Sequence, residues 1–375
     1  MLVNEAKLMS GSAGTTVETG PVSHRPRVGH EIVKSHPQDF LVSESLVLPV
    51  CDRERTAKFT YLRVSKVGFT TFEAVAAIGD HLGLSRSQVM FAGLKDEDAI
   101  TDQVIGTEGH VSDELIELFN RRYNSDKHRF MNLQRCGVGN ESIRVGQLNG
   151  NSFRVVVRNL SERFAQRFIE GNRYTFYFLN YYDTQRFGVS QQLKLNHLIG
   201  RALIDEDLDT AFELVTQMGT SESEKARDFF RNRQDYFLQL DPQLLNFFKN
   251  SYSAYLWNQS LAQLVREVCA GQAFEEGWDN ISFLFVRKQS DALSILKERQ
   301  LLEFTKFYHP VNGARNVPKL RATVIQIQLL CNSIAPDEDH PGAYKNEVSF
   351  FLPPGSYATM GIKQLVRSSD FQGDE

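Results

Sequence analysis

Residues 150–158, with the sequence GNSFRVVVR, open with a Gly-Asn turn signal and continue as a β-branched run, which predicts a strand. Two other segments also have a composition that predicts a strand. DFLVSESLVLP at 39–49 and EVSFFL at 347–352 each favour a strand, and the Pro-Pro-Gly that follows the latter would stop it. Strand-rich sequence therefore lies on both sides of the middle of the chain.

The middle of the chain, residues 180–325, has a different pattern. Apolar residues recur there at helical spacing in LNHLIGRALI, LDTAFELVTQM, QLLNFFKNSYSAYLWNQSLAQLVREV and DALSILKERQLLEF. Because the strand-rich flanks can complete one sheet, this pattern predicts a helical domain inserted into a sheet domain. FEAVAAIGDHLGL at 72–84 predicts a further helix with Gly83 as its stop, and another helix is expected at 360–366.

The chain has 375 residues, 42 Lys and Arg, 46 Asp and Glu, and 41% hydrophobic residues, so its formal net charge is −4. This composition is typical of a soluble globular protein of about two to three domains and excludes a disordered or collagen-like chain. Residues 1–27 are rich in Gly, Ser, Thr and Pro and are expected to form a flexible tail. No stretch approaches the ~20 apolar residues that span a membrane, and the start lacks a signal-peptide core, so a cytoplasmic location is expected.

FAGLKDEDAITDQ at 91–103 is the first candidate for chemistry, because a carboxylate follows a lysine shortly after a Gly at the end of a strand. An adjacent cation favours the ionised form of Asp96, which suits a base or a nucleophile. The same pattern is more commonly a solvated turn, in which Asp96, Asp98 or Asp102 caps a helix.

VKSHPQDFLVSE at 33–44 is the second candidate. Pro37 sets an extended or turned entry to the strand and places Lys34 and Glu44 at opposite ends of one rigid element. The alternative is a surface lysine, with Asp39 holding the turn.

LNGNSF at 148–153 is the third candidate. Its Gly allows an unusual backbone angle, so Asn151 can bond neighbouring groups. An exposed Phe153 would stack on an unpaired base, a contact worth about 1–3 kcal/mol. A Phe153 buried in the core is the default alternative.

LNYYDTQRFG at 179–188 mixes aromatic, amide and guanidinium groups that suit contacts with phosphates and bases, and Arg186 is its candidate for substrate binding. A hydrogen-bonded hinge between domains is an equal alternative.

A basic cluster is a candidate surface for a nucleic-acid backbone, with a solvated face as the alternative. It comprises Arg121, Arg122, Lys127, Arg129 and Arg135. The four cysteines lie far apart without a C-x-x-C pair, so reduced structural thiols are expected and no metal site is predicted.

Six segments, taken in this order, resemble the TruD family of pseudouridine synthases: KSHPQDFLVSE, FAGLKDEDAITDQ, LNGNSFRVVVR, NYYDTQRFG, SAYLWNQSL and FLPPGSYAT. They span nearly all of the chain after the tail. The resemblance implies an α+β fold, in which a pseudouridine synthase-type catalytic domain with a mainly antiparallel sheet is interrupted by a helix-rich inserted domain. The implied catalytic domain comprises residues 28–178 and 331–375, and the implied inserted domain comprises residues 179–330.

The resemblance also implies an enzyme that isomerises uridine to pseudouridine in RNA, with position thirteen of tRNA as the expected target and without a metal or organic cofactor. By position, Asp96 is implied as the catalytic aspartate, and the implied pocket residues are Lys34, Phe40, Glu44, Asn151 and Phe153. Two routes stay open: the carboxylate attacks C1′ of the ribose, or it removes a C2′ proton to give a glycal. Either route needs a nearby cation, for which Lys34 is the candidate. The expected partner is RNA, and neither a membrane nor an obligatory protein partner is expected.

Three positions depart from the family pattern. Glu97 and Asp98 follow Asp96 where basic or neutral residues are expected, and Asp183 stands where a Gly is expected after paired aromatic residues. A second interpretation is an RNA-binding or tRNA-folding protein of the same fold with weak or lost catalysis. A third, a phosphoryl hydrolase, would need a Mg²⁺ site with further acidic residues.

Overall fold

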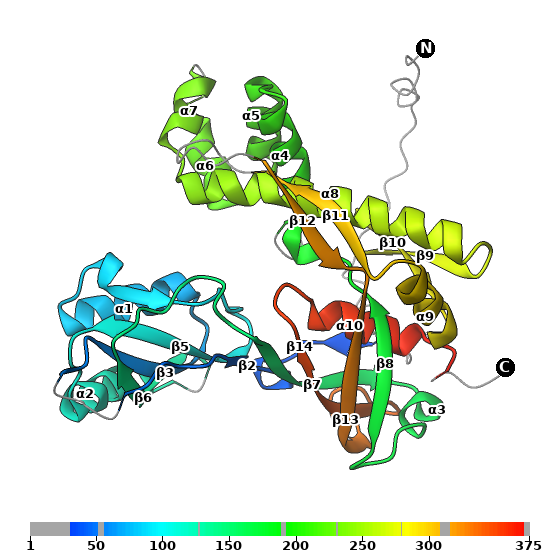
Figure 1. Cartoon of the computed structure of the whole chain (residues 1–375), viewed down its shortest axis with the longest axis horizontal. Coiled ribbons are helices and arrows are strands. Elements are labelled where there is room, and N and C mark those ends of the chain that lie inside the picture. Colours follow the sequence, from blue (N-terminus) through cyan, green and yellow to red (C-terminus); the bar gives the residue numbers. More distant parts are fainter. Residues whose placement is uncertain are drawn as a thin grey trace, which may run out of the picture.

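The computed structural model describes most of the chain from residue 31 to residue 370 (Figure 1). The described ranges are 31–51, 56–126, 128–188, 193–229, 232–278, 280–307 and 316–370. The tail predicted at 1–27 lies outside these ranges, and so does Lys127 of the predicted basic cluster. No helix within the described ranges is long and apolar enough to cross a membrane.

One ten-stranded sheet runs through the molecule in the order β6-β3-β5-β2-β7-β14-β13-β8, with β1 paired to β7 and β4 paired to β5. Its strands are β1 (Ile32–Val33), β2 (Phe40–Ser45), β3 (Phe59–Val67), β4 (Val89–Phe91), β5 (Ile100–Glu108), β6 (Phe130–Gly139), β7 (Gly150–Leu160), β8 (Arg173–Leu179), β13 (Val324–Pro336) and β14 (Tyr344–Leu352). The β2–β5 pair is parallel, and the other pairs of this sheet are antiparallel. The predicted α+β class with a mainly antiparallel sheet is confirmed.

Two helices, α1 (Thr71–Leu82) and α2 (Asp113–Tyr123), cover β3, β5 and β6 at one end of the sheet (Figure 1). α1 begins at a capping box formed by Thr70 and Glu73. It ends at Gly83, whose φ of +68° lies in the left-handed region that glycine adopts without strain. The predicted helix and its stop are therefore confirmed.

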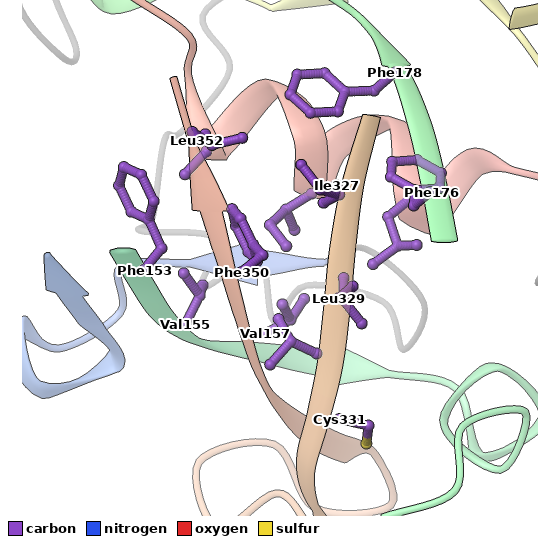
Figure 2. Packing of buried hydrophobic residues seen from close by; sticks show 14 of the residues in the cluster. Phe153, Val155, Val157, Phe176, Phe178, Ile327, Leu329, Cys331, Phe350 and Leu352 are labelled. Carbon is purple, nitrogen blue, oxygen red and sulfur yellow. The ribbon is translucent and has the colours of Figure 1, made fainter. Parts of the chain in front are cut away.

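At the other end of the sheet, α10 (Ala358–Arg367) and the short α3 (Glu162–Ala165) contribute to an apolar core with β7, β8, β13 and β14 (Figure 2). The ring of Phe153 stacks on Phe350 with centroids 5.6 Å apart. Gly150 opens β7 where an added Cβ would lie 2.2 Å from the carbonyl oxygen of Leu352, so only glycine lets β7 and β14 approach this closely. This packing fixes the position of Phe153.

The inserted region leaves the sheet after β8 and returns at β13, where Val324 pairs with Leu179. Its helices are α4 (Asn196–Ile204), α5 (Leu208–Gln217), α6 (Ser221–Arg227), α7 (Arg233–Gln239), α8 (Pro242–Val268) and α9 (Gln289–Glu298). Two strand pairs join them, β9 (Ala273–Trp278) with β10 (Ile281–Val286) and β11 (Leu301–Lys306) with β12 (Val317–Ala322). α8 has 27 residues, a length of about 40 Å, and contributes to two apolar clusters, one with α4 to α7 and one with β9, β10 and α9.

Two expectations about the insertion differ from the structure. The main sheet resumes at Val324, so the boundary predicted at 330 falls inside β13. Residues 301–304, predicted as helical, belong to β11. α9 ends because Arg299 takes extended backbone angles, and the sequence then alternates between exposed and half-buried positions, which is the period of a strand.

Candidate active site

The pairing of β2 with β7 brings four predicted pocket residues onto one face of the sheet. Glu44 pairs directly with Asn151, and Val42 pairs with Phe153. Directly paired residues share a face, and side chains two positions apart along a strand point to the same side. Phe40 therefore lies on the same face as these pairs. The alternation that predicts the strands also assembles this part of the site.

The segment between β4 and β5 carries Lys95 and Asp96 and is held by a chain of hydrogen bonds. The backbone N–H of Lys95 donates to Oγ1 of Thr71 at 2.9 Å, and that hydroxyl donates to Oε1 of Gln103 at 3.1 Å. The amide of Gln103 donates in turn to the carbonyl oxygen of Gly93 at 3.4 Å. The pattern Gly-x-Lys-Asp-x-x-Ala-x-Thr-x-Gln thus contains residues that fix the loop as well as the carboxylate that the loop presents.

Lys95 and Asp96 each pair with a charged residue from the segment that contains β2. Nζ of Lys95 lies 2.7 Å from Oε1 of Glu44, whose other oxygen accepts the N–H of Val104 at 3.1 Å. Nζ of Lys34 donates to Oδ2 of Asp96. The side chains of Lys95 and Glu44 are 5% and 0% exposed, whereas those of Lys34 and Asp96 are 19% and 39% exposed. The second pair is therefore the accessible one.

Lys34 is placed by an unusual backbone and by an anchored turn. Its φ of +63° lies in the left-handed region, which a lysine rarely adopts. The turn that follows, η1 (Pro37–Asp39), is fixed by Asp39, which accepts two hydrogen bonds from the buried Arg158 at 2.7 and 2.9 Å. The interpretation of Asp39 as the residue that holds the turn is confirmed. The ammonium of Lys34 also lies 4.3 Å from the ring centroid of Phe40.

Lys66 in β3 is a buried cation that the sequence patterns did not single out. Its side chain is fully buried, and its Nζ donates to the carbonyl oxygens of Phe69 and Asp96 at 2.7 and 2.9 Å. Burial lowers the pKa of Lys66 from the usual 10.5 to about 8, while the charge of Asp96 acts in the opposite direction. Lysines are mostly exposed, so only the fold reveals that this one supports the Asp96 loop.

These groups surround a pocket of about 140 Å³. Five predicted residues line it: Lys34, Phe40, Asp96, Asn151 and Phe153. Oδ1 of Asn151 is buried without a hydrogen-bond partner in the described part of the chain, so a bound molecule would be needed to satisfy it. The pocket shares Lys34 and Gln185 with a larger cavity of about 920 Å³, whose walls come from both the sheet domain and the inserted helices.

Two predicted site residues, Glu44 and Arg186, lie outside the lining of this pocket. Glu44 holds Lys95, which does reach the pocket, so the carboxylate supports the wall. Arg186 lines a neighbouring cavity, and its guanidinium lies 4.9 Å from the ring centroid of Phe247. Gln185, one residue earlier in the turn η4 (Thr184–Arg186), contributes to the pocket instead.

The segment 179–188 also forms the junction between the sheet and the insertion. Nε1 of Trp257 donates to the carbonyl oxygen of Asn180 at 3.0 Å. The side-chain amide of Asn258 makes two hydrogen bonds of 2.9 Å with the backbone of Tyr182. Trp257 and Asn258 belong to α8, so the motifs NYYDTQRFG and SAYLWNQSL contact each other directly. The hydrogen bonds agree with the alternative of a hydrogen-bonded connection between domains, and residues 179–188 are called the hinge segment below.

Two charged residues complete the junction. Asp183, a departure from the family pattern, is buried and accepts hydrogen bonds from Lys363 at 2.7 Å and from Thr359. Because Thr359 lines the pocket, Asp183 links the hinge to the pocket wall. Arg321 in β12, which the sequence patterns did not single out, donates to Oδ1 of Asn180 at 2.8 Å.

The described arginines of the predicted basic cluster are engaged with neighbouring groups. Three of them form ion pairs, namely Arg121 with Glu117, Arg129 with Glu73 and Arg135 with Asp113. A fourth, Arg122, lies over the ring of Tyr123. These contacts favour the solvated-face alternative over an open cationic surface.

Within the described ranges, no group of three or more His, Cys, Asp or Glu residues is suited to a metal ion.

Comparisons with known proteins identify the family of the chain. A family model described as tRNA pseudouridine synthase D (TruD) matches residues 22–238. A protein of Methanococcus aeolicus named probable tRNA pseudouridine synthase D is 25% identical over 398 aligned residues, which cover 89% of this chain and 95% of that protein. The tRNA pseudouridine synthase D of Leptospira interrogans is 24% identical, covering 90% of this chain and 96% of that protein.

A crystal structure of a protein of the same family description, from Methanosarcina mazei, has a similar fold. Its TM-score is 0.54 at 17% identity, and the alignment covers 91% of this chain and 94% of that one. The chain belongs to the TruD family, whose members are named as tRNA pseudouridine synthases and are isomerases. The family predicted from the six sequence segments is confirmed.

Proposed function

We propose that this protein isomerises uridine to pseudouridine in tRNA, with position thirteen as its target and Asp96 as the reacting carboxylate. The observation that carries the proposal is the Lys34–Asp96 pair at the pocket, where Asp96 is the only acid among the described residues that line it. Family membership supports the reaction class. The alternative of an RNA-binding protein without catalysis is disfavoured, because the carboxylate and its cation are both in place.

The size and polarity of the pocket suit a single base. Its volume of about 140 Å³ lies below the roughly 300 Å³ at which pockets begin to enclose drug-sized ligands, so a base fits better than a whole nucleotide. The target uridine would leave its stack to enter, as bases do in enzymes that act on them. The unsatisfied Oδ1 of Asn151 would accept a hydrogen bond from N3–H of the uracil ring, and the ring of Phe153 would contact its face.

The reaction requires no external group. The bond from ribose C1′ to N1 breaks, the base turns, a bond from C1′ to C5 forms, the C5 hydrogen leaves as a proton, and N1 gains a proton. Asp96 would either attack C1′ or remove a proton from C2′ to give a glycal. Both routes start from the carboxylate of Asp96, and the ammonium of Lys34, which donates to it, would stabilise charge there during the reaction. Lys66 would keep the loop in place through the carbonyl oxygen of Asp96.

The larger cavity would receive the tRNA around the target base. It shares the lining residues Lys34 and Gln185 with the pocket and has walls from η1, η4, α4, α6 and α8. The inserted domain would grip the tRNA body. Contacts with phosphates would make binding weaken as salt rises.

The test is tritium release from tRNA labelled at uridine C5, measured in EDTA for wild type, Asp96→Asn and Asp80→Asn. Asp80 is exposed on α1 and serves as the matched control. We expect release by wild type and Asp80→Asn and none by Asp96→Asn. Binding of tRNA without release by wild type would favour the RNA-binding alternative, and release that EDTA abolishes would favour a metal-dependent reaction.

A further inference from the structure

A second cavity, of about 380 Å³, lies beside the pocket at the junction of the sheet and the insertion. Its walls come from the hinge segment, from α8, from the β11–β12 strand pair and from the loop before α10. The residues that line it and carry charge or an aromatic ring are Tyr182, Arg186, Phe304, Lys306, Lys319 and Arg321.

The register of β11 with β12 gathers most of these groups on one face. Phe304 pairs directly with Lys319, and Leu302 pairs with Arg321. Positions two apart along a strand share a face, so Lys306, two residues after Phe304, points to the same side as both pairs. Three cations and one aromatic ring therefore lie together on a two-stranded ribbon that forms one wall of the cavity.

The cavity is cationic in a chain whose net charge is −4. Among the described residues that line it, four are Lys or Arg and none is Asp or Glu, whereas the larger cavity has four acids, Glu97, Asp98, Asp183 and Glu222, beside Lys34 and Lys194. Like charges that line one cavity repel one another, and a bound anion would relieve that repulsion. The cavity is therefore suited to a negatively charged ligand.

Arg321 and Arg186 differ in whether their guanidinium donors have hydrogen-bond partners. The guanidinium of Arg321 donates to Asn180 and to the carbonyl oxygen of Gly355 and lies 4.0 Å from the ring centroid of Tyr182, so it fixes the walls. Nε of Arg186, in contrast, is a buried donor without a hydrogen-bond partner in the described part of the chain. A buried donor of this kind calls for an acceptor such as a phosphate oxygen.

The cavity adjoins the candidate active site. Ser356 lines both spaces, and Arg186 directly follows Gln185, which lines the Asp96 pocket. A ligand that fills both spaces would therefore present a base to one and an anionic group to the other. A phosphodiester next to the target uridine has this arrangement, and the rings of Tyr182 and Phe304 offer a surface for the neighbouring base.

We propose that this cavity binds the backbone phosphate of a nucleotide that flanks the target uridine, with Arg186, Lys306 and Lys319 as its contacts and Arg321 as a positioning residue. This assignment rests on the proposed function, because it needs an RNA strand whose target base occupies the Asp96 pocket. The assignment gives Arg186 a role in binding the substrate although its side chain lies outside the Asp96 pocket.

The first test is the salt dependence of tRNA binding by wild type, Lys319→Gln and Lys297→Gln. Lys319 is exposed on β12, and Lys297 is an exposed lysine on α9 that does not line the cavity. Each phosphate contact contributes roughly 0.7 to 0.9 to the slope of log K against log salt. We expect the slope to fall in magnitude by about that amount for Lys319→Gln, to stay unchanged for Lys297→Gln, and to be restored in Lys319→Arg. Equal slopes for wild type and Lys319→Gln would overturn the proposal.

The second test places the phosphate by a double-mutant cycle. A tRNA joined from synthetic halves would carry a neutral methylphosphonate at one of the two linkages that flank uridine 13, or at a linkage in the acceptor stem. If Lys319 contacts the replaced phosphate, Lys319→Gln and the neutral linkage each remove the same interaction. We therefore expect both changes together to weaken tRNA binding no more than either change alone. Additive losses at both flanking linkages, or coupling only at the acceptor stem, would overturn the proposal. Tritium release by wild type, measured in parallel, separates this outcome from failure of the proposed function.

Discussion

Lys95 and Asp96 are adjacent in the chain, yet their ion pairs lie in different surroundings. The Lys95–Glu44 pair is enclosed, with 5% and 0% of its side chains exposed, while the Lys34–Asp96 pair faces the pocket with 19% and 39% exposed. Glu44 has a second donor in the N–H of Val104, so its charge is satisfied within the protein. The enclosed pair is suited to holding the pocket together, and the open pair is suited to meeting a substrate.

Desolvation explains why this difference matters. Removing one partner of a buried pair leaves an uncompensated charge in a poorly solvated place, which strongly destabilises the fold. An ion pair that water can reach contributes little to stability, because solvent screens the charges and replaces the lost contact. Substitutions at the enclosed pair should therefore change folding, and substitutions at the open pair should change activity.

The largest effect is expected for Asp96→Asn. The substitution keeps the shape of the side chain and removes the carboxylate, so the rate of tritium release should fall by about 10⁴-fold or more. The free energy of unfolding should change by less than about 1 kcal/mol. Single-turnover assays and denaturant unfolding measure the two quantities, and a folded variant with near wild-type release would contradict the role of Asp96.

The next effect is expected for Lys95→Met, which leaves Glu44 buried without its cation. We expect the free energy of unfolding to fall by about 3–5 kcal/mol, as measured by denaturant titration. The double variant Lys95→Met with Glu44→Leu is the control, since replacing both charges by apolar groups should recover most of this loss. Equal stability of Lys95→Met and wild type would show that the pair is dispensable for folding.

A smaller effect is expected for Lys34→Ala. Loss of the cation beside Asp96 should lower tritium release by about 10²-fold, which is the range for removing one group that stabilises charge in a transition state. Stability should change by less than about 1 kcal/mol, because the pair is partly exposed. Lys58→Ala, at an exposed lysine of the segment that precedes β3, provides a control and should match wild type in both assays. A large loss of stability in Lys34→Ala would remove the contrast between the two pairs.

The last prediction concerns pH and Lys66. The pKa of Lys66 is lowered by burial to about 8 in the folded protein, against 10.5 for an ordinary lysine. Between pH 8 and 10.5 the unfolded chain therefore binds more protons at this position, and the stability of wild type should rise with pH relative to Lys66→Met. Unfolding free energies of both proteins at pH 7.5, 9 and 10.5 measure the difference, with the three values chosen to span roughly that window. Wild-type stability that stays constant or falls with pH relative to Lys66→Met would contradict a lowered pKa.

The sequence predicts the paired strands of the site well, because alternation along β2 and β7 determines both strand and face. Phe40, Asn151 and Phe153 reach the pocket for this reason. Lys34 and Asp96 also line the pocket. They lie 62 positions apart in the chain, and their contact was expected from the family resemblance and not from a local pattern.

Residues whose role depends on distant packing escaped the sequence patterns. In the sequence, Lys66 looks like a surface lysine in a strand, but in the structure it is buried and donates to the carbonyl oxygens of Phe69 and Asp96. Arg321 lies on a short strand that follows apolar sequence with helical spacing, so neither the strand nor its cationic face was predicted. The sequence did single out Arg186 as a substrate-binding candidate, but it did not predict that the turn η4 places this side chain in the cavity beside the pocket.

The most direct measurement compares Asp96→Asn with Glu44→Gln in single-turnover tritium release from C5-labelled tRNA, with the folded fraction of each variant determined in the same buffer. We expect Asp96→Asn to be fully folded and to release no tritium, while Glu44→Gln should be destabilised and its folded fraction should still release tritium. Release by folded Asp96→Asn at the wild-type rate would show that this carboxylate does not perform the chemistry.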